Sequence, residues 1–485
     1  MKTNTLDFDA QALRERILDL AMRGKLVPQD PNDEPASVLL EKIKAEKEEL
    51  VKEKKIKKSK PLPAITDDEK PFNIPDSWEW VRFSELFNIE GGSQPPKSTF
   101  SDTGGKGKIR LFQIRDYGEN PVPVYIPIDK AKKISQIGDI LLARYGASLG
   151  KVFFAEYGAY NVALAKVLFN FKSEDFILKK YLFYYFKSEL YQNFVRSNSR
   201  SAQAGFNKSD LNRLVFPVPP ISEQKRIAAK IAQLFALLRK VESSTQQYAK
   251  LQTLLKSKVL DLAMRGKMVK QDPNDEPASV LLEKIKTEKA ELVKEKKIKK
   301  SKPLPPITDE EKPFDIPDNW EWVRVGNIIN LFNGKAFKPS DWSVSGLPIV
   351  RIQNLNNAEA PYHYYNGQIE ERFYLKGGEL LFSWSGTPGT SFGAHIWRNE
   401  KAVLNQHIFK LIFDMTKLNK KYLAEALDFR VLTLINEAHG SAGLRHITKK
   451  MFEETIIPIP PLEEQKRIVN EIAYFTGTYP LYHST

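Results

Sequence analysis

Residues 18–82 read LDLAMRGKLVPQDPNDEPASVLLEKIKAEKEELVKEKKIKKSKPLPAITDDEKPFNIPDSWEWVR. Residues 260–324 repeat this stretch with 57 of 65 positions identical. The segments that follow the two copies are only distantly alike. A long internal repeat indicates an architecture built from two equivalent units. One constant block carrying two different inserts therefore predicts a scaffold that presents two different recognition modules.

Shorter repeats extend this pattern. The motif PPISEQKRI at 219–227 returns as PPLEEQKRI at 460–468, and residues 13–25 match residues 255–267. After Pro220, apolar residues recur at three-to-four spacing up to Gly266, which predicts one helix of about 44 residues and about 65 Å. Its stripe comprises Ile227, Ile231, Leu234, Leu238, Val241, Tyr248, Leu251, Leu255 and Val259. Ser222 is the expected N-cap, with Glu223 favoured in the first turn by the helix dipole.

A helix this long needs a partner to cover its stripe. The segments that match its two halves stand at opposite ends of the chain, at 13–25 and 460–468. The chain is therefore predicted to be a circularly permuted two-fold repeat, in which a second rod is divided between the termini. The second rod loses its pattern after Ala473, so its last stretch is expected to be short.

The repeated block itself is predicted to be helical. Residues Pro35 and Ala36 open a helix with Val38, Leu39, Ile43, Leu50 and Val51 on one face. The sequence KPLP at 60–63 is expected to end it, because proline cannot continue the backbone ladder. Its twin is expected from about residue 278 to residue 300.

These elements predict a mixed α+β fold. Two globular α/β domains are separated by long helices that form an antiparallel coiled coil, in a pseudo-two-fold, circularly permuted repeat. The strands that open each domain read WEWVR (78–82 and 320–324), and LVFPVPP and TIIPIPP close them. Inner strands are expected at 140–142 and 379–382. The predicted divisions are a helical region with a lysine-rich segment (1–77), insert one (78–220), a central helical region (221–319), insert two (320–461) and a short C-terminal helix (462–485).

Charge favours a polyanionic partner. The formal net charge is +14, and KEKKIKKSK occurs at both 52–60 and 294–302. Such runs either contact phosphate groups or form solvated helix faces. The candidate phosphate contacts are Lys54, Lys55, Lys57, Lys58, Lys296, Lys297, Lys299 and Lys300.

Composition excludes several classes of protein. Cysteine is absent, which excludes disulfides and thiolate metal sites and fits a reducing cytoplasm. No apolar run approaches the length of a membrane span, and the N-terminal residues are too polar for a signal peptide. We therefore expect a cytoplasmic protein.

Catalytic motifs are also missing. The sequence lacks the Asn/Asp-Pro-Pro-aromatic motif of amino-methyltransferases and a glycine-rich cofactor turn. Residues 145–152 resemble a phosphate loop, but the run is one residue short and Val152 cannot bind Mg²⁺, so a turn between strands is preferred. All six histidines lie in the second half, which excludes a metal mechanism shared by both halves. No catalytic or metal site is predicted.

The motifs AMRGKLVPQDPNDEPASVLLEKI, IPDxWEWVR and PPxxEQKRI, each in the expected order twice, resemble the specificity (S, HsdS) subunits of type I restriction–modification systems over the whole chain. The resemblance implies that each insert is a target-recognition domain that reads one half of a bipartite, gapped double-stranded DNA site. It implies a non-catalytic chain that joins two methyltransferase (M) subunits and restriction (R) subunits. S-adenosylmethionine would belong to the M subunits, which methylate adenine at N6, and ATP and Mg to the R subunits, which cleave unmodified DNA.

Direct readout of bases needs planar donor and acceptor side chains. In insert one the candidate DNA-binding residues are Gln94, Lys97, Arg110, Gln113, Arg115, Arg144, Ser148, Lys151, Arg200, Gln203 and Lys208. In insert two they are Lys335, Lys338, Arg351, Gln353, Asn354, Ser385, Thr387, Asn405, Gln406, Arg445 and His446. Arg110 and Gln113 are expected at positions similar to those of Arg351, Gln353 and Asn354.

One alternative comes from a different class. A scaffold whose two modules bind proteins, with helical rods for oligomerisation, would show the same doubled layout. The basic charge and the polar loops favour DNA over this reading.

Overall fold

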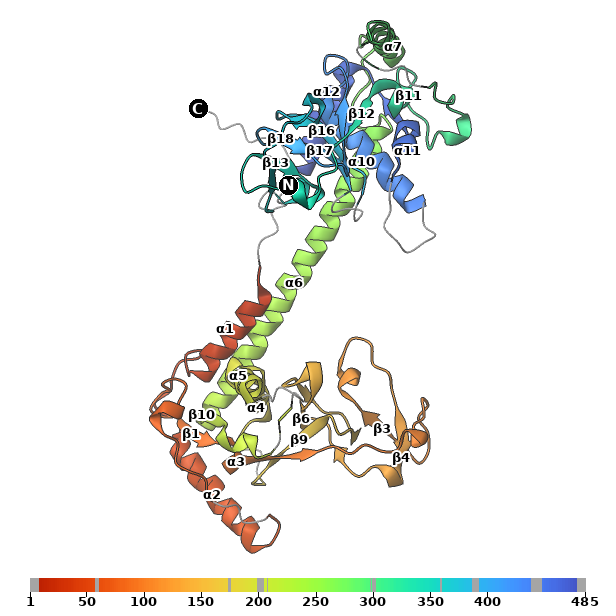
Figure 1. The fold of residues 1–485 in the computed structure, drawn as a ribbon. Coiled ribbons are helices and arrows are strands. Elements are labelled where there is room, and N and C mark those ends of the chain that lie inside the picture. The colour runs from red at the N-terminus through yellow and green to blue at the C-terminus, as the bar shows by residue number, and fades with distance from the viewer. Residues whose placement is uncertain are drawn as a thin grey trace. The chain divides into compact units, whose positions relative to one another are not determined.

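The computed structural model describes residues 8–56, 61–172, 176–198, 205–206, 208–296, 298, 302–357, 360–385, 392–437 and 447–477. The chain forms two compact units, residues 1–246 and 247–485. Helix α6 (Ile221–Met264), the long yellow-green helix of Figure 1, contributes its first half to one unit and its second half to the other.

The first unit contains five helices besides α6 in its described residues: α1 (Ala10–Met22), α2 (Ala36–Lys52), α3 (Phe83–Leu86), α4 (Lys179–Lys187) and α5 (Glu189–Asn198). Its strands are β1 (Glu79–Arg82), β2 (Phe87–Gly91), β3 (Lys108–Phe112), β4 (Tyr125–Pro127), β5 (Ile134–Ser135), β6 (Ile140–Ala143), β7 (Val152–Phe154), β8 (Gly158–Tyr160), β9 (Leu164–Phe169) and β10 (Val215–Val218).

The described residues of the second unit contain the helices α7 (Ala278–Lys294), α8 (Val325–Ile328), α9 (Ile352–Asn356), α10 (Lys420–Glu437), α11 (Lys449–Glu454) and α12 (Leu462–Thr476). Its strands are β11 (Glu321–Arg324), β12 (Asn330–Asn333), β13 (Leu347–Val350), β14 (His363–Tyr365), β15 (Tyr374–Leu375), β16 (Leu380–Ser383), β17 (Gly393–Ile396), β18 (Ala402–Leu404), β19 (Ile408–Ile412) and β20 (Ile456–Ile459).

The first and last strands of each insert pair with each other. Strand β1 pairs antiparallel with β10, and β11 pairs in the same way with β20. The predicted WEWVR entry strands and apolar exit strands are confirmed, and the structure adds that the two strands of each insert pair with each other. Because the entry and exit lie side by side, an insert can differ in sequence without changing how it joins the repeated block.

The interior of each insert holds two four-stranded sheets. Their orders are β2-β9-β6-β7 and β4-β3-β8-β5 in insert one, and β12-β19-β16-β17 and β14-β13-β18-β15 in insert two. Strands β6 and β16, predicted from short apolar runs, are buried at every residue. The two orders correspond strand for strand, so two dissimilar sequences share one mixed α+β fold.

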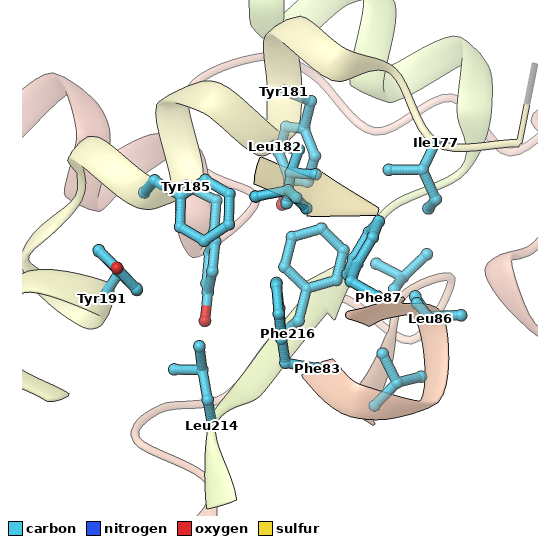
Figure 2. Close-up of a cluster of buried hydrophobic side chains, with 14 of the residues drawn as sticks. Phe83, Leu86, Phe87, Ile177, Tyr181, Leu182, Tyr185, Tyr191, Leu214 and Phe216 are labelled. Carbon is cyan, nitrogen blue, oxygen red and sulfur yellow. The ribbon is translucent and has the colours of Figure 1, made fainter. Parts of the chain in front are cut away.

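An aromatic core packs α4 and α5 of insert one against its exit strand β10. Phe83, Phe87, Tyr185, Tyr191 and Phe216 pack together in Figure 2, and all are at most 1 % exposed. The hydroxyl of Tyr185 donates to the Val215 carbonyl at 2.8 Å, which satisfies its polar group inside the core. This packing holds α4 and α5 against the closing strand β10.

The predicted long helix is confirmed: α6 spans 44 residues, but it begins at Ile221, so that Ser222 lies in its first turn and is not the N-cap. In the first unit, Ile227 and Ile231 share a core with Leu18 and Met22 of α1. In the second unit, Val259 and Met264 share a core with residues Ile468 and Ile472 of α12. Each half of α6 is thus paired with a helix from one end of the chain, as the divided second rod predicted.

Coverage of the α6 stripe is incomplete. Val241, Tyr248, Leu251 and Leu255 are each at least 43 % exposed, although the sequence predicted that a partner helix would cover them. The prediction was wrong for these residues because α1 and α12 are short.

The helices of the repeated block end earlier than predicted. Helix α2 ends at Lys52 and α7 at Lys294, rather than near residues 60 and 300. Lys54 adopts a left-handed conformation (φ 58°), and its amide donates to the Val51 carbonyl. This hydrogen-bond pattern terminates a helix without glycine.

The apolar face of α2 is buried only in part. Leu39, Ile43 and Leu50 are buried as expected, whereas Val38 and Val51 are half-buried.

None of the described helices is both long and apolar enough to cross a membrane.

Candidate functional site

Four chain segments of insert one meet where its two inner sheets adjoin. The amide of Ser93, just after β2, donates to the Tyr160 carbonyl at 3.1 Å. The amide of Asn161, just after β8, donates to the Phe112 carbonyl at the end of β3 (3.0 Å). The amide of Arg144, just after β6, donates to the Ala163 carbonyl (2.9 Å). The ends of β2, β3 and β6 and the β8–β9 turn therefore form one surface.

Insert two builds the same surface. The amide of Lys335, just after β12, donates to the Leu404 carbonyl at 2.8 Å, and the amide of Asn405 donates to the Val350 carbonyl at 3.1 Å. Strand β16 pairs with β19 so that Ser383 faces Ile408, which brings the next residue, Trp384, beside His407. The ring centroids of Trp384 and His407 are 5.4 Å apart.

Two residue types hold this arrangement in both inserts. A Cβ atom at Gly92 would lie 2.0 Å from the Asn161 carbonyl oxygen, and one at Gly334 would lie 2.1 Å from the Asn405 carbonyl oxygen. Only glycine fits at either position. The side-chain oxygens of Asn161 and Asn405 accept from the amides two residues ahead. Asn405, a candidate DNA contact, thus also shapes the turn.

Strand register defines which side chains are equivalent. Phe112 pairs with Tyr160 as Val350 pairs with Leu404, so Gln113 corresponds to Arg351. The same register refines the expectation for Arg110, whose counterpart is Pro348 rather than Arg351. The remaining equivalences follow from the hydrogen bonds and strand pairs above and are Ser93 with Lys335, Arg144 with Trp384, and Ala163 with His407.

The turn that follows β3 or β13 is capped from within. Asp116 accepts from the Gln113 amide at 2.7 Å, and Asn354 accepts from the Arg351 amide at 3.1 Å. Asn354 is 4 % exposed and its own amide donates to the Ala360 carbonyl. Asn354, a predicted DNA contact, therefore supports the loop from inside. Arg351, three residues earlier, is half-buried and leaves part of its side chain accessible.

Aromatic faces hold the cations of the surface. The Arg144 guanidinium lies over the Tyr145 ring, 5.1 Å from its centroid. The Lys335 ammonium donates to the Tyr365 hydroxyl at 3.1 Å and lies over the Phe337 and Tyr365 rings. A cation stacked in this way keeps its charge but loses conformational freedom, which prepares it for a planar or anionic ligand.

The other described candidates differ in how far they are exposed. Gln94, Lys97, Arg115, Lys151, Lys208, Lys338, Gln353 and Gln406 are exposed, Ser148 is half-buried in the turn between β6 and β7, and Ser385 is buried. Arg110 is half-buried on β3, 3.6 Å from Asp116. Five candidates lie outside the described residues: Arg200, Gln203, Thr387, Arg445 and His446.

Ser93 and Trp384 lie at this surface but were not predicted from the sequence. Ser93 follows a Gly-Gly pair and Trp384 follows a buried strand. Both signals mark the end of a strand at a sheet edge, but only the register shows that the two ends meet other loops.

The lysine runs are partly described. Lys55 lies 2.8 Å from Glu53, and Lys172 lies 3.6 Å from the same carboxylate. Hydrogen bonding to Lys55 lowers the pKa of Glu53. Lys54 and Lys296 follow the ends of α2 and α7 in the left-handed conformation. Lys57, Lys58, Lys297, Lys299 and Lys300 lie outside the described residues.

Glu223 and Gln224 of the EQKRI motif are buried, whereas Lys225 is exposed. Glu223, expected in the first turn of the helix, accepts from Trp78 Nε1 (2.8 Å) and Gln29 Nε2 (2.5 Å). Gln224 accepts from the Leu178 amide at 2.9 Å, and Arg226 pairs with Asp33. Burial raises the pKa of Glu223. We call this set the carboxylate lock, because it joins α6, the repeated block and insert one.

The second unit contains the same lock. Glu464 accepts from Trp320 Nε1 (3.0 Å) and Gln271 Nε2 (2.6 Å), and burial raises its pKa as well. Gln465 accepts from the Asn419 amide, and Arg467 pairs with Asp275. The residues that join each insert to its helix are therefore identical in the two units.

Among the described residues, no group of three or more histidine, aspartate or glutamate side chains is placed so that it could hold a metal ion. The surface consists of donors, cations and aromatic faces, which can bind and discriminate a ligand.

Comparison with known proteins finds the same division of the chain into two equivalent parts. A family model described as "Type I restriction modification DNA specificity domain" matches residues 75–252 and again 317–480. The EcoAI specificity subunit of Escherichia coli is 34 % identical, over 96 % of this chain and 88 % of its own length. The EcoEI specificity subunit of the same organism is 32 % identical, over 96 % and 89 %. A chain from a solved type I R-M system resembles the fold with a TM-score of 0.53 at 18 % identity, covering 84 % of this chain and 92 % of that one.

Proposed function

The chain belongs to the family of type I restriction–modification specificity subunits, the non-catalytic DNA-recognition components of those systems, and we propose that its two inserts each read one half of a bipartite, gapped DNA site. One observation carries this proposal. The inserts share the same strand order and the same glycine and asparagine supports, yet differ at the equivalent side chains Gln113/Arg351 and Arg144/Trp384. A constant backbone with unlike polar side chains suits two unlike sequences.

The division into modules follows from the same observations. Residues 78–220 and 320–461 enter and leave through paired strands, and each is fastened by a carboxylate lock of identical residues. We propose that each of these ranges is an exchangeable target-recognition domain, and that the helical regions 1–77, 221–319 and 462–485 form the constant part.

The constant part would bind the catalytic subunits. Each half of α6 leaves apolar side chains exposed: Leu237 and Val241 in the first unit, and Tyr248, Leu251, Leu254 and Leu255 in the second. Exposed apolar residues in a stripe favour a helical partner. We propose one methyltransferase subunit on each half, supplying S-adenosylmethionine, with restriction subunits supplying ATP and Mg, all in the cytoplasm.

Exchange of insert one tests the proposal. Replacing residues 78–220 by the corresponding insert of another specificity subunit should change one half of the methylated motif and leave the other half intact. Methylated adenines are mapped across the genome of cells that carry the chain, its methyltransferase partner and no restriction subunit. The reciprocal exchange of residues 320–461 is the matched control and should change only the other half. Alteration of both halves by either exchange would contradict independent modules.

A further inference from the structure

Buried polar atoms without hydrogen-bond partners lie at the candidate surface of both inserts, and Gln113 and Arg351 carry them at the same register position. Five such side-chain atoms lie at the register-equivalent positions of the candidate surface: Ser93 Oγ, Gln113 Nε2, Arg144 Nε, Arg351 Nε and His407 Nδ1. A buried polar atom without a partner costs about 1–3 kcal/mol. A concentration of such atoms at one surface, in both inserts, calls for partners from outside the chain, either water or a ligand.

We propose that Gln113 and Arg144 in insert one, and Arg351 in insert two, determine which bases the inserts read. The inference rests on the proposed function and assigns specificity to individual residues. Arginine pairs with the O6 and N7 atoms of guanine, and glutamine with the N6 and N7 atoms of adenine. Insert one then reads an adenine with Gln113 and a guanine with Arg144. Insert two reads a guanine with Arg351, at the position that Gln113 occupies in insert one.

The surroundings of Arg144 support a specific role for it. A Cβ atom at Gly91 would lie 2.6 Å from Arg144 Nη1, so glycine leaves the room that the guanidinium occupies. In insert two the counterpart of Gly91 is Asn333, and Trp384 replaces Arg144. The Trp384 ring packs against His407 and against Phe409, at 5.4 Å and 5.8 Å between centroids. The two positions differ together, as expected when each pair fits a different base.

Binding to phosphate alone does not account for the pattern. Phosphate contacts carry no sequence information, so two surfaces with one backbone could use the same cations for them. Instead, the backbone supports are the same in both inserts, but the side chains at equivalent positions differ. Insert two has Arg351 where insert one has Gln113, and Trp384 where insert one has Arg144. Two half-sites share the same phosphate backbone and differ only in their bases. A difference in side chains between the two surfaces therefore corresponds to a difference in the bases that they read.

Three variants test the inference: Arg144→Gln, Gln113→Arg and Arg351→Gln, each in the full chain with its methyltransferase partner in cells without restriction. Mapping of N6-methyladenine should show that Arg144→Gln relaxes one base of one half-site, with discrimination falling about 10- to 100-fold. Gln113→Arg should replace an adenine by a guanine at one position of the same half-site. Arg351→Gln should relax one base of the other half-site.

The unaffected half of each motif reports that the variant folds and assembles. Lys130→Gln is the matched control, because Lys130 is exposed and lies just after the end of β4 that pairs with Lys108, at the opposite end of β3 from Gln113. It should leave every base unchanged. An unchanged motif in Arg144→Gln and Gln113→Arg would overturn the inference, as would a uniform loss of methylation with the motif intact. A wild-type chain that directs no bipartite methylation would overturn the proposed function itself.

Discussion

Opposite charges occupy the same place in the two inserts. Tyr181 and Tyr422 are equivalent, since their hydroxyls donate to the carbonyls of Pro217 and Pro458. Lys187 and Asp428 each lie six residues further along. Burial lowers the pKa of Lys187 and raises that of Asp428 to about 7. In each insert, therefore, burial at this position favours the neutral form of an ionisable side chain.

The substitution Asp428→Asn should change how stability depends on pH. The folded-state pKa of about 7 lies above the ordinary value of 3.8, so the contribution of Asp428 is complete below pH 3.8 and is lost as the pH rises toward 7. Asparagine still accepts from the Ala394 amide, which donates to Asp428 Oδ1 at 2.7 Å. Relative to the variant, the free energy of unfolding of the second unit should fall by roughly 4 kcal/mol between pH 4 and pH 8.

Hydrogen exchange of peptides from residues 402–430 measures this effect in both proteins at each pH. Glu371→Gln is the control, because Glu371 is exposed and hydrogen bonding to Lys376 lowers its pKa. Parallel pH profiles for wild type and Asp428→Asn would show that the carboxyl group stays ionised throughout this range.

Between elements, the carboxylate lock joins helix α6 to insert one through hydrogen bonds to the buried side chains of Glu223 and Gln224. The two oxygens of Glu223 each accept one donor, Trp78 Nε1 or Gln29 Nε2. In Glu223→Gln one oxygen becomes an amide nitrogen, so that a buried donor faces another donor. The junction should lose about 1–3 kcal/mol.

Amide exchange of the first turns of α6 reports this loss. Protection of residues 221–231 should fall in Glu223→Gln, whereas residues 462–472, which carry the intact second lock, should keep theirs. Glu463→Gln changes an exposed carboxylate of α12 and should leave both stretches unchanged. Equal protection of residues 221–231 in wild type and Glu223→Gln would show that the lock does not fasten the helix.

Elements defined by local pattern were predictable from the sequence. The apolar period of α6 and the apolar, proline-containing exit strands are local signals, and both predictions were correct. The end of α2 was not predictable, because lysine favours helices and no glycine marks the left-handed turn at Lys54. Nor was the role of Glu223, whose partners lie 145 and 194 residues away along the chain.

Over the whole molecule, the two-fold repeat was predictable from the sequence, but the candidate DNA-binding surface was predictable only in part. Repeats and charge indicated two modules for a polyanion, and Gln113, Arg144 and Arg351 were among many polar candidates near turns. Their juxtaposition depends on the parallel pairing of β3 with β8 and of β13 with β18. A sequence pattern of period two predicts a strand but not its neighbour, which is why Ser93 and Trp384 were missed.

The lysine runs give a prediction about the complex as a whole. Replacing Lys54, Lys55, Lys57 and Lys58 by glutamine should weaken binding to every DNA sequence alike, because phosphate contacts carry no base information. The slope of log affinity against log salt should decrease by about 0.9 for each phosphate that the variant no longer neutralises. Titration of specific and unrelated duplexes with the complex at several salt concentrations measures both quantities.

Lys42 and Lys70 provide the matched control for these lysines. They pair with Glu34 and Asp67 at 2.6 Å and 2.7 Å, so their replacement removes the same kind of charge from elsewhere in the repeated block. The double variant should keep the wild-type slope. If the slope is also unchanged after the fourfold replacement, the run serves a solvated face or a contact between subunits. A reduced slope with an unchanged preference for the specific duplex would instead place the run on the DNA backbone and leave base selection to the inserts.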